Sequence, residues 1–225
     1  MIICHGRGVN RLCSLQYLQL LKDANLDKDY NIFIPDFRNS GASDEARTKL
    51  GYNFAQDILH TMEMLKDKYG LNNFTLYGFS QGAMGAAIVS KLHVHSLRKK
   101  GLKIDKLILD SPISNVKKRI KQDAKKRKVP KFIVSIITRI FNFRVGNHLE
   151  KLRLSYLLKR VPTLILQTKN DKATTYGMLM EEYNKIAQNS NVQLKVFEKG
   201  AHIRIYAEPE YKEEYTKIVA DFLRS

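Results

Sequence analysis

Residues 74–82 read FTLYGFSQG and contain the most specific pattern in the chain. Residues 74–77 form a short apolar run typical of a strand, and the small residues of 83–89 are typical of a helix. Between them lies G-x-S-x-G, with Gly78 and Gly82 on either side of Ser80. Glycines permit the sharp turn that projects a serine hydroxyl above the end of a strand. The pattern therefore predicts that Ser80 is a nucleophile.

Short apolar runs and amphipathic stretches alternate on both sides of this turn. The runs of strand length are residues 2–4, 30–34, 74–77, 106–109, 163–166 and 192–197. Helical spacing of apolar residues occurs in residues 15–21, 54–65, 178–186 and 211–222. Strands that alternate with helices predict an α/β fold: a mostly parallel sheet of about six strands, flanked by helices.

Positive charge is concentrated in one segment. The chain has 39 Lys and Arg against 22 Asp and Glu, a net charge of +17. Residues 112–160 hold 15 of the basic residues and only two acidic ones, Asp123 and Glu150. A structureless loop of this length is improbable in a domain, and the apolar run at 132–141 has helical character. We predict a core of residues 1–111 and 161–225, with residues 112–160 inserted after the fourth strand as a basic helical cap.

Length and composition limit the class of protein. A chain of 225 residues with 44% hydrophobic residues is expected to form one domain with a sizeable core, which excludes global disorder. No apolar run is long enough to span a membrane, and residues 1–8 lack the apolar region of a secretory signal. Two cysteines, Cys4 and Cys13, do not make a disulfide scaffold. These features favour a cytoplasmic protein, with the inner face of the membrane as a second location.

A serine nucleophile needs a base, and His202 is the best placed histidine. It lies in Lys199-Gly200-Ala201-His202, between the last predicted strand and the last helix, so it is expected at the same sheet edge as Ser80. The remaining candidates are interpreted as packing or solvated side chains: His60, His93, His95 and His148. His93 and His95 have no acidic or cysteine ligand nearby in sequence, so no metal site is predicted.

The base also needs an acid that orients it. Asp171 follows the strand at 163–166 in a turn-rich stretch, which gives the chain order Ser, Asp, His. Asp110, after the preceding strand, is the alternative, because it would also lie near the site. Asp36 is a weaker alternative and is expected to order its own loop. We favour Asp171, since an exposed loop suits a functional carboxylate.

The turn after the first strand is the expected source of an oxyanion hole. Residues 4–8 read Cys-His-Gly-Arg-Gly. The backbone N–H groups of Arg7 and Gln81 are the predicted donors to a developing oxyanion. His5 is interpreted as a structural residue that hydrogen-bonds the neighbouring loop, and residues 36–43 are expected to pack against it.

Together these residues resemble the α/β-hydrolase superfamily. The resemblance rests on His5-Gly6, the D-F-R-x-x-G-x-S pattern at 36–43, the G-F-S-Q-G at 78–82, Asp171 and His202. It is nearest to bacterial serine hydrolases similar to serine aminopeptidases and carboxylesterases. It implies the α/β-hydrolase fold and a Ser-His-Asp triad. One departure is that two strands usual before the His-Gly strand are missing, so the strand predicted at 30–34 would be left as an edge.

The first functional hypothesis is a serine hydrolase acting on short to medium acyl esters through an acyl-enzyme intermediate. Peptidase or thioesterase activity is less favoured, and no metal or organic cofactor is expected. Apolar residues of the cap would supply an acyl-binding wall: Phe132, Ile133, Ile136, Ile137 and Phe141. The structural alternative is that these residues only dock the cap on the core.

The second hypothesis is a binding protein on a shortened and inactive hydrolase scaffold. Lysine and arginine interleaved with isoleucine and phenylalanine suit an anionic membrane or polymer surface. The segment has no aromatic platform for single-stranded nucleic acid, so no specific nucleic acid partner is predicted. The alternative without a binding function is that the cap presents a solvated lysine-rich face. The sequence does not determine the oligomeric state.

Overall fold

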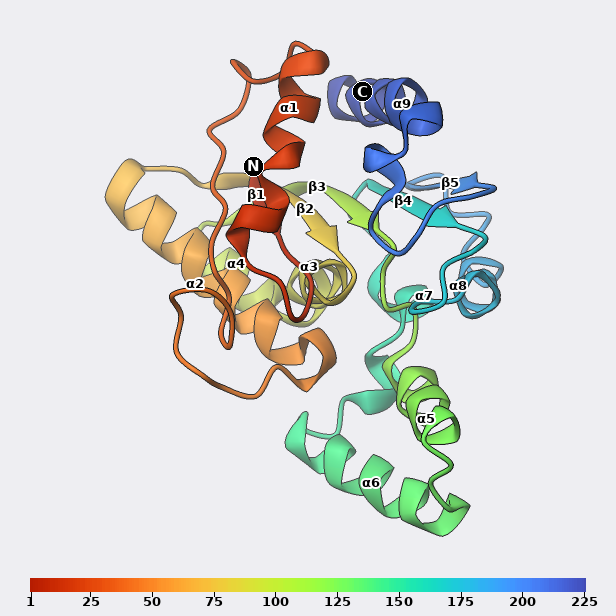
Figure 1. The fold of residues 1–225 in the computed structure, drawn as a ribbon. Coiled ribbons are helices and arrows are strands. Elements are labelled where there is room, and N and C mark those ends of the chain that lie inside the picture. Colours follow the sequence, from red (N-terminus) through yellow and green to blue (C-terminus); the bar gives the residue numbers. More distant parts are fainter.

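The computed structural model describes all residues from Met1 to Ser225, and a five-stranded parallel sheet forms its centre (Figure 1). The strands lie in the order β1-β2-β3-β4-β5, and every neighbouring pair is parallel. Their bounds are β1 Ile2–Cys4, β2 Asn73–Phe79, β3 Lys103–Asp110, β4 Thr163–Thr168 and β5 Val192–Phe197. The carboxyl ends of parallel strands share one edge, so the loops that leave them are brought together.

Nine α-helices connect the strands or follow them. They are α1 Gln16–Asp23, α2 Tyr52–Tyr69, α3 Gln81–Leu92, α4 Val94–Lys99, α5 Val116–Lys126, α6 Lys131–Arg144, α7 Leu154–Leu157, α8 Tyr176–Tyr183 and α9 Pro209–Arg224. Short 3-10 turns occupy Arg11–Ser14, Lys49–Gly51, Leu149–Lys151 and Ile205–Ala207. None of the helices combines the length and the apolar character that crossing a bilayer requires.

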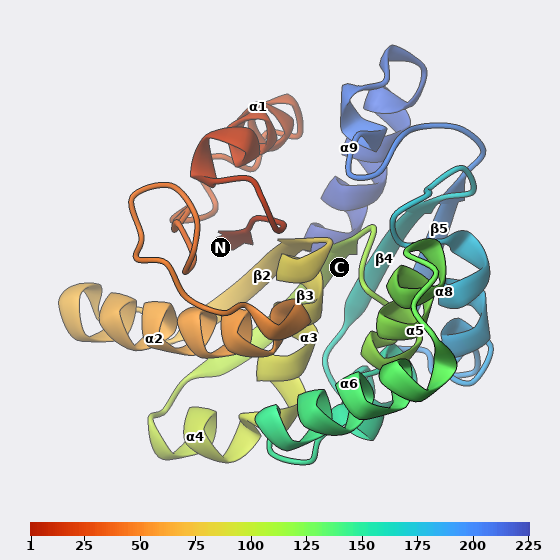
Figure 2. The same cartoon turned by 60° about the horizontal axis from the view of Figure 1, so that its bottom comes forward.

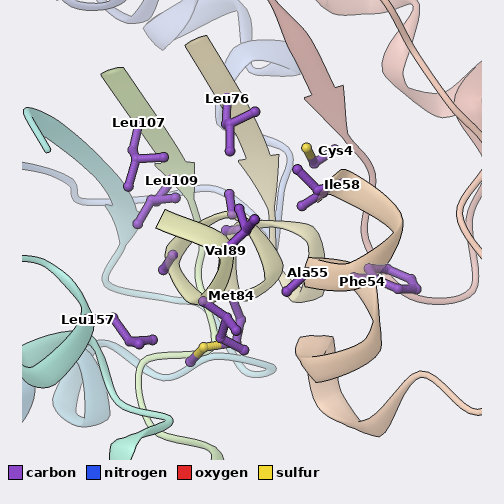
Figure 3. Packing of buried hydrophobic residues seen from close by; sticks show 14 of the residues in the cluster. Cys4, Phe54, Ala55, Ile58, Leu76, Met84, Val89, Leu107, Leu109 and Leu157 are labelled. Carbon is purple, nitrogen blue, oxygen red and sulfur yellow. The ribbon is translucent and has the colours of Figure 1, made fainter. Parts of the chain in front are cut away.

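Each face of the sheet has its own hydrophobic cluster, because successive strand residues point to opposite faces. Leu76 packs in the first cluster with residues of α2 and α3, as Figure 3 shows. Tyr77, the next residue, packs in the second cluster with residues of α1 and α9. Both clusters contain fully buried side chains from β1 and β3. The sheet is therefore covered on both faces, as the sequence predicts for an α/β fold.

The prediction of about six strands is wrong by one. Residues 30–34 do not form a strand, and only Phe33 makes an isolated parallel bridge, to Ile2. Two hydrogen bonds hold it: the Ile3 N–H donates to the Phe33 oxygen at 3.0 Å, and the Phe33 N–H donates to the Met1 oxygen at 2.9 Å. The segment has the composition of a strand, but its one partner, β1, is three residues long. No strand pairs with its outer side, so the ladder does not extend.

Residues 112–160, called the basic segment below, contain α5, α6, the 3-10 turn Leu149–Lys151 and α7. The two ends of the segment are tied together, since the Val116 N–H donates to the Leu152 oxygen at 3.0 Å and the Leu154 N–H to the Ser114 oxygen at 2.9 Å. Residues near these ends belong to the first core cluster. Figure 1 shows α5 and α6 projecting from the rest of the chain, and Figure 2 shows them in front, with the bottom of Figure 1 turned forward. The helix predicted from the apolar run at 132–141 is confirmed as α6, and none of its residues is fully buried.

Candidate active site

Ser80 lies at the junction of β2 and α3 in a strained backbone conformation. Its φ of +51° and ψ of −109° fall in a region that residues with a side chain rarely adopt. Two neighbours must be glycine for the turn to close. A Cβ on Gly78 would lie 2.6 Å from the Ala83 Cα, and one on Gly82 would lie 2.2 Å from the Cys4 oxygen. The predicted strand–turn–helix context of Ser80 is therefore present.

His202 and Asp171 meet at the same sheet edge. The loop after β5 carries His202, and its Nδ1 donates to the Asp171 Oδ2 at 2.7 Å. Asp171 follows β4 and is 3% exposed. Burial raises the pKa of Asp171, but the hydrogen bond and charge of His202 and donors from Thr174 outweigh it, so this pKa lies below its ordinary value. An ionised Asp171 can fix the ring orientation of His202 and stabilise its protonated form.

No hydrogen bond joins Ser80 and His202 in this structure. The backbone of Ser80 is instead held by the end of β3. Its N–H donates to the Asp110 oxygen at 2.9 Å. Hydrogen bonds between a nucleophile and its base are often long in the absence of substrate and tighten when substrate binds. The structure thus brings Asp171, after β4, to His202. Ser80 follows β2, which lies two strands away from β4 along the same edge of the sheet.

Asp110, the alternative acid, makes a separate set of contacts. It is fully buried at the end of β3 and accepts hydrogen bonds from the Tyr215 hydroxyl at 2.7 Å and the Ser111 hydroxyl at 2.8 Å. Tyr215 in turn shares a 2.5 Å hydrogen bond with Tyr77. Burial raises the pKa of Asp110 to about 6, although both hydroxyl groups oppose the shift. Asp110 does not hydrogen-bond His202, so the structure favours Asp171 as the orienting acid.

Two backbone N–H groups beside Ser80 lack partners in secondary structure. A Cβ on Gly6 would lie 3.5 Å from the Ser80 Cβ, so the turn after β1 runs directly beside Ser80. The N–H of Arg7, in this turn, makes no hydrogen bond to another backbone group. Gln81 is the first residue of α3, where an N–H has no partner within the helix. Unpaired N–H groups at such a turn and at a helix N-terminus can stabilise an oxyanion.

His5 holds the turn after β1 against the loop after residue 34. Its Nδ1 donates to the Gly6 oxygen at 2.7 Å, which leaves Nε2 to accept from the Phe37 N–H at 2.9 Å. Burial lowers the pKa of His5, and the bond to Gly6 opposes this only in part. Asp36 orders its own loop by accepting from the N–H groups of Arg11 and Ala42. Both residues thus have the structural contacts expected from the sequence.

The five apolar residues predicted as an acyl-binding wall are not gathered into one surface. Phe132, Ile136 and Ile137 are exposed by 69%, 55% and 41%, while Ile133 and Phe141 are half-buried. Phe141 packs against the first core cluster. The reason is helical geometry: positions 132 and 136 lie on a face of α6 roughly opposite that of position 141. The five side chains therefore do not share one face of α6, and their role as an acyl-binding wall stays a prediction.

A cavity of about 310 Å³ lies instead between the turn after β1, α1 and the loop that carries His202. Its lining includes Gly6, Phe79 and Ile203, which are neighbours of Arg7, Ser80 and His202 in sequence. The other lining residues are His5, Val9, Leu12, Cys13, Ser14, Gln16, Tyr17 and Arg204. Sequence analysis missed this cavity, because its walls come from separate parts of the chain and α1 has no motif of its own.

Sequence analysis also missed the residues that hold Asp171. The Thr174 hydroxyl donates to Asp171 Oδ2 at 2.8 Å, and the backbone N–H groups of Ala173 and Thr174 donate to Oδ1 at 2.7 and 2.9 Å. Gln167 Nε2 also reaches Oδ2, at 3.3 Å. The only signal in the sequence was Asp171 itself, because an aspartate in a turn commonly accepts hydrogen bonds from the backbone N–H groups two and three residues later.

The remaining histidines lie away from this edge, on α2, at the start of α4 and in the basic segment. Burial lowers the pKa of His93, and the positive charges of His148 and His60 lower it further. No three side chains among the histidines, cysteines, aspartates and glutamates are placed to hold a metal ion together.

Comparison with known proteins gives matches over the whole chain. A family model described as alpha/beta hydrolase fold matches residues 1–128. Among curated proteins, the uncharacterized protein YqkD of Bacillus subtilis is 25% identical over 228 residues, covering 99% of this chain and 70% of that protein.

Solved structures of esterases and a lipase share the fold. An esterase of Pyrococcus furiosus superposes with a TM-score of 0.70 at 23% identity, covering 99% of this chain and 80% of the esterase. An esterase of Exiguobacterium antarcticum gives a TM-score of 0.63 at 20% identity, with coverages of 100% and 91%. A monoacylglycerol lipase of Paleococcus ferrophilus gives 0.65 at 15% identity, with coverages of 99% and 92%.

Proposed function

The chain belongs to the α/β-hydrolase family, and within it we propose that this protein is a serine hydrolase that cleaves short to medium acyl esters. The observation that carries the proposal is the 2.7 Å hydrogen bond between His202 and Asp171, at the sheet edge where Ser80 sits in its strained turn. Family membership supports a hydrolase, and the fold shared with esterases supports an ester as substrate.

In the proposed mechanism Ser80 Oγ attacks the ester carbonyl carbon while its proton passes to His202 Nε2. Asp171 holds the Nδ1–H of His202 and stabilises the imidazolium. The N–H groups of Arg7 and Gln81 donate to the oxyanion of the tetrahedral intermediate. His202 then returns the proton to the leaving alkoxide, and the alcohol departs from an acyl-enzyme.

Water completes the cycle by the same route. His202 Nε2 takes a proton from the attacking water, a second tetrahedral intermediate forms, and the carboxylic acid leaves as Ser80 regains its proton. The reaction consumes one water and one ester and gives one acid and one alcohol. Every proton moves between substrate, water, Ser80 and His202.

The cavity of about 310 Å³ supports a small substrate. Its volume lies at the lower end of the range for small-molecule pockets, which is about 300 to 1,000 Å³. Val9, Leu12 and Ile203 give it apolar walls next to the turn that carries Arg7. We place the acyl group there, so short chains should be hydrolysed faster than long ones.

A fluorophosphonate probe tests the nucleophile directly, because an activated serine displaces fluoride and retains the phosphonyl group. Intact mass is measured for the wild type, Ser80→Ala and a matched control, Ser90→Ala, which changes a serine further along α3. One adduct is expected on the wild type and on Ser90→Ala, and none on Ser80→Ala. A folded wild type without an adduct, or an adduct retained by Ser80→Ala, contradicts the proposal. A panel of p-nitrophenyl esters of increasing acyl length then measures the chain preference.

A further inference from the structure

One face of α6 is apolar and uncovered. Phe132, Ile136, Ile140 and Phe143 are exposed by 69%, 55%, 46% and 78%. Their spacing of four, four and three residues places them on one face of the helix, called the apolar stripe below. Large side chains at these exposures rarely form a contiguous surface on a protein without serving an interaction.

A groove between α5 and α6 gathers positive charge. It has a volume of about 1,040 Å³, and its charged walls are formed by Lys117, Lys121, Lys125, Lys128, Lys131 and Arg139, with one acid, Glu150. Lys117 pairs with Glu150. The other five cations make no ion pair within the chain, although Arg119 and Lys118 nearby do. These six basic residues are called the basic groove below.

The apolar stripe and the basic groove lie side by side on the same helix. On α6 the groove is lined by Lys131, Val134, Ser135, Thr138, Arg139 and Asn142. Most of these positions precede a position of the stripe by one residue, which is a rotation of about 100° around a helix with 3.6 residues per turn. A single flat partner can therefore contact both faces at their shared border.

We propose that α5 and α6 dock on the surface of an anionic lipid bilayer, with the apolar stripe in the acyl-chain boundary and the basic groove at the phosphate groups. An anionic bilayer offers negative charge and an apolar layer at adjacent depths, which matches the two faces. A soluble polyanion such as nucleic acid would neutralise the groove but leave the stripe in water. A second copy of the chain would cover the stripe but would bring two strongly basic segments together.

Vesicle flotation tests the docking and does not depend on catalysis. The full chain is mixed with vesicles of phosphatidylcholine alone or of phosphatidylcholine and phosphatidylglycerol in equal parts. We expect binding to the anionic vesicles only, weakened at least tenfold between about 50 mM and 500 mM salt, where screening shortens from more than 10 Å to about 4 Å. Ser80→Ala should bind as the wild type does, so this inference and the proposed function can fail separately.

Paired variants separate the two faces. Phe132→Ser combined with Phe143→Ser removes apolar area from the stripe, and its control is Met64→Ser with Tyr69→Ser, at exposed apolar sites on α2. A second variant replaces four groove lysines by glutamine, and its control replaces four exposed lysines elsewhere. The groove positions are Lys121, Lys125, Lys128 and Lys131, and the control positions are Lys28, Lys68, Lys99 and Lys217. Each test variant should lower vesicle affinity at least about tenfold, and each control by less than about twofold.

Three outcomes would overturn the docking. Undiminished vesicle binding by the phenylalanine variant would mean that the stripe does not enter the bilayer. Failure to bind anionic vesicles, with tight salt-sensitive binding to a short RNA, would assign the groove to nucleic acid. A dimer in sedimentation that the phenylalanine variant abolishes, again without vesicle binding, would assign the stripe to a second copy of the chain.

Discussion

The Asp171 carboxylate accepts hydrogen bonds from four residues and is 3% exposed, whereas not one side chain of α6 is fully buried. The first region has its polar atoms fixed by neighbours from β4 and from the loops after β4 and β5. The second has its apolar atoms exposed and most of its groove cations unpaired. The difference supports the proposed chemistry at the sheet edge, where side chains are held in place, and the proposed partner of α5 and α6 outside the chain.

Changing one carboxylate to an amide in each region should give the largest difference in kcat between the two regions. Asp171→Asn keeps the shape but replaces the acceptor that holds the Nδ1–H of His202, so kcat for a short ester should fall about 10³- to 10⁴-fold. Asp123→Asn, in α5, removes only a partner of Arg119. It should leave kcat within about twofold. Steady-state kinetics on both variants, with circular dichroism to check folding, measures the contrast.

A methyl group added at the sheet edge should cost more than one added at an open helix position. Gly82→Ala would place a Cβ 2.2 Å from the Cys4 oxygen, and neither backbone can move easily. We expect a loss of at least about 3 kcal/mol in the free energy of unfolding, the upper range of overpacking effects. Gly177→Ala, in α8, meets nothing within 4 Å and should change stability by less than about 1 kcal/mol. Urea unfolding gives both values, and equal losses would contradict the close packing of α3 against β1.

Asp110 predicts a pH dependence of stability that an exposed carboxylate would lack. Its pKa is raised from an ordinary value of 3.8 to about 6 in the folded chain, chiefly by burial. Between these pH values the folded chain keeps a proton that the unfolded chain has lost, so the free energy of unfolding falls as pH rises and becomes flat above about 6. A difference of about two between the folded and unfolded pKa corresponds to about 3 kcal/mol in the free energy of unfolding. The free energy of unfolding of the wild type minus that of Asp110→Asn, measured from pH 4 to 7, should show this slope. Parallel curves of free energy against pH for the two proteins would contradict it.

The sequence predicted the parts of the site that depend on local pattern and strand order. Ser80 is signalled by a turn that only glycines at 78 and 82 permit. His202 and Asp171 could be predicted because each follows a parallel strand, and such strands end at one edge. The contacts of Asp110 could not be predicted, since Tyr215 approaches it from α9, more than 100 residues along the chain.

Two apolar segments, residues 30–34 and α6, are covered less than their composition alone suggests. Residues 30–34 have the composition of a strand, and α6 has the apolar content of a buried helix, but burial depends on what lies beside a segment. Residues 30–34 have only the short β1 for backbone pairing, and α6 packs mainly against α5, with Phe141 reaching the first core cluster. Periodicity identifies an apolar face; it does not identify what covers that face.

Modification of Cys13 should change substrate size preference and not chemistry. Cys13 is exposed and lines the cavity beside the proposed acyl site, whereas Cys4 is buried and burial raises the pKa of its thiol. N-ethylmaleimide should therefore react at Cys13 alone and raise KM for longer acyl esters about fivefold, with little effect on kcat. Cys13→Ser treated with the same reagent is the control and should be unaffected. Loss of kcat for the shortest ester as well would mean that the adduct disturbs the catalytic residues themselves.

The smallest expected effect on stability is at the apolar stripe. Phe143 is 78% exposed, so Phe143→Ala removes little packing and should change the free energy of unfolding by less than about 0.5 kcal/mol. Phe54, fully buried in the first core cluster, is the matched control, and Phe54→Ala should cost about 3 to 5 kcal/mol. A loss above about 1.5 kcal/mol at Phe143 would show that α6 is packed in solution. The stripe would then be part of the folded core, and its exposure could no longer be an argument for a partner.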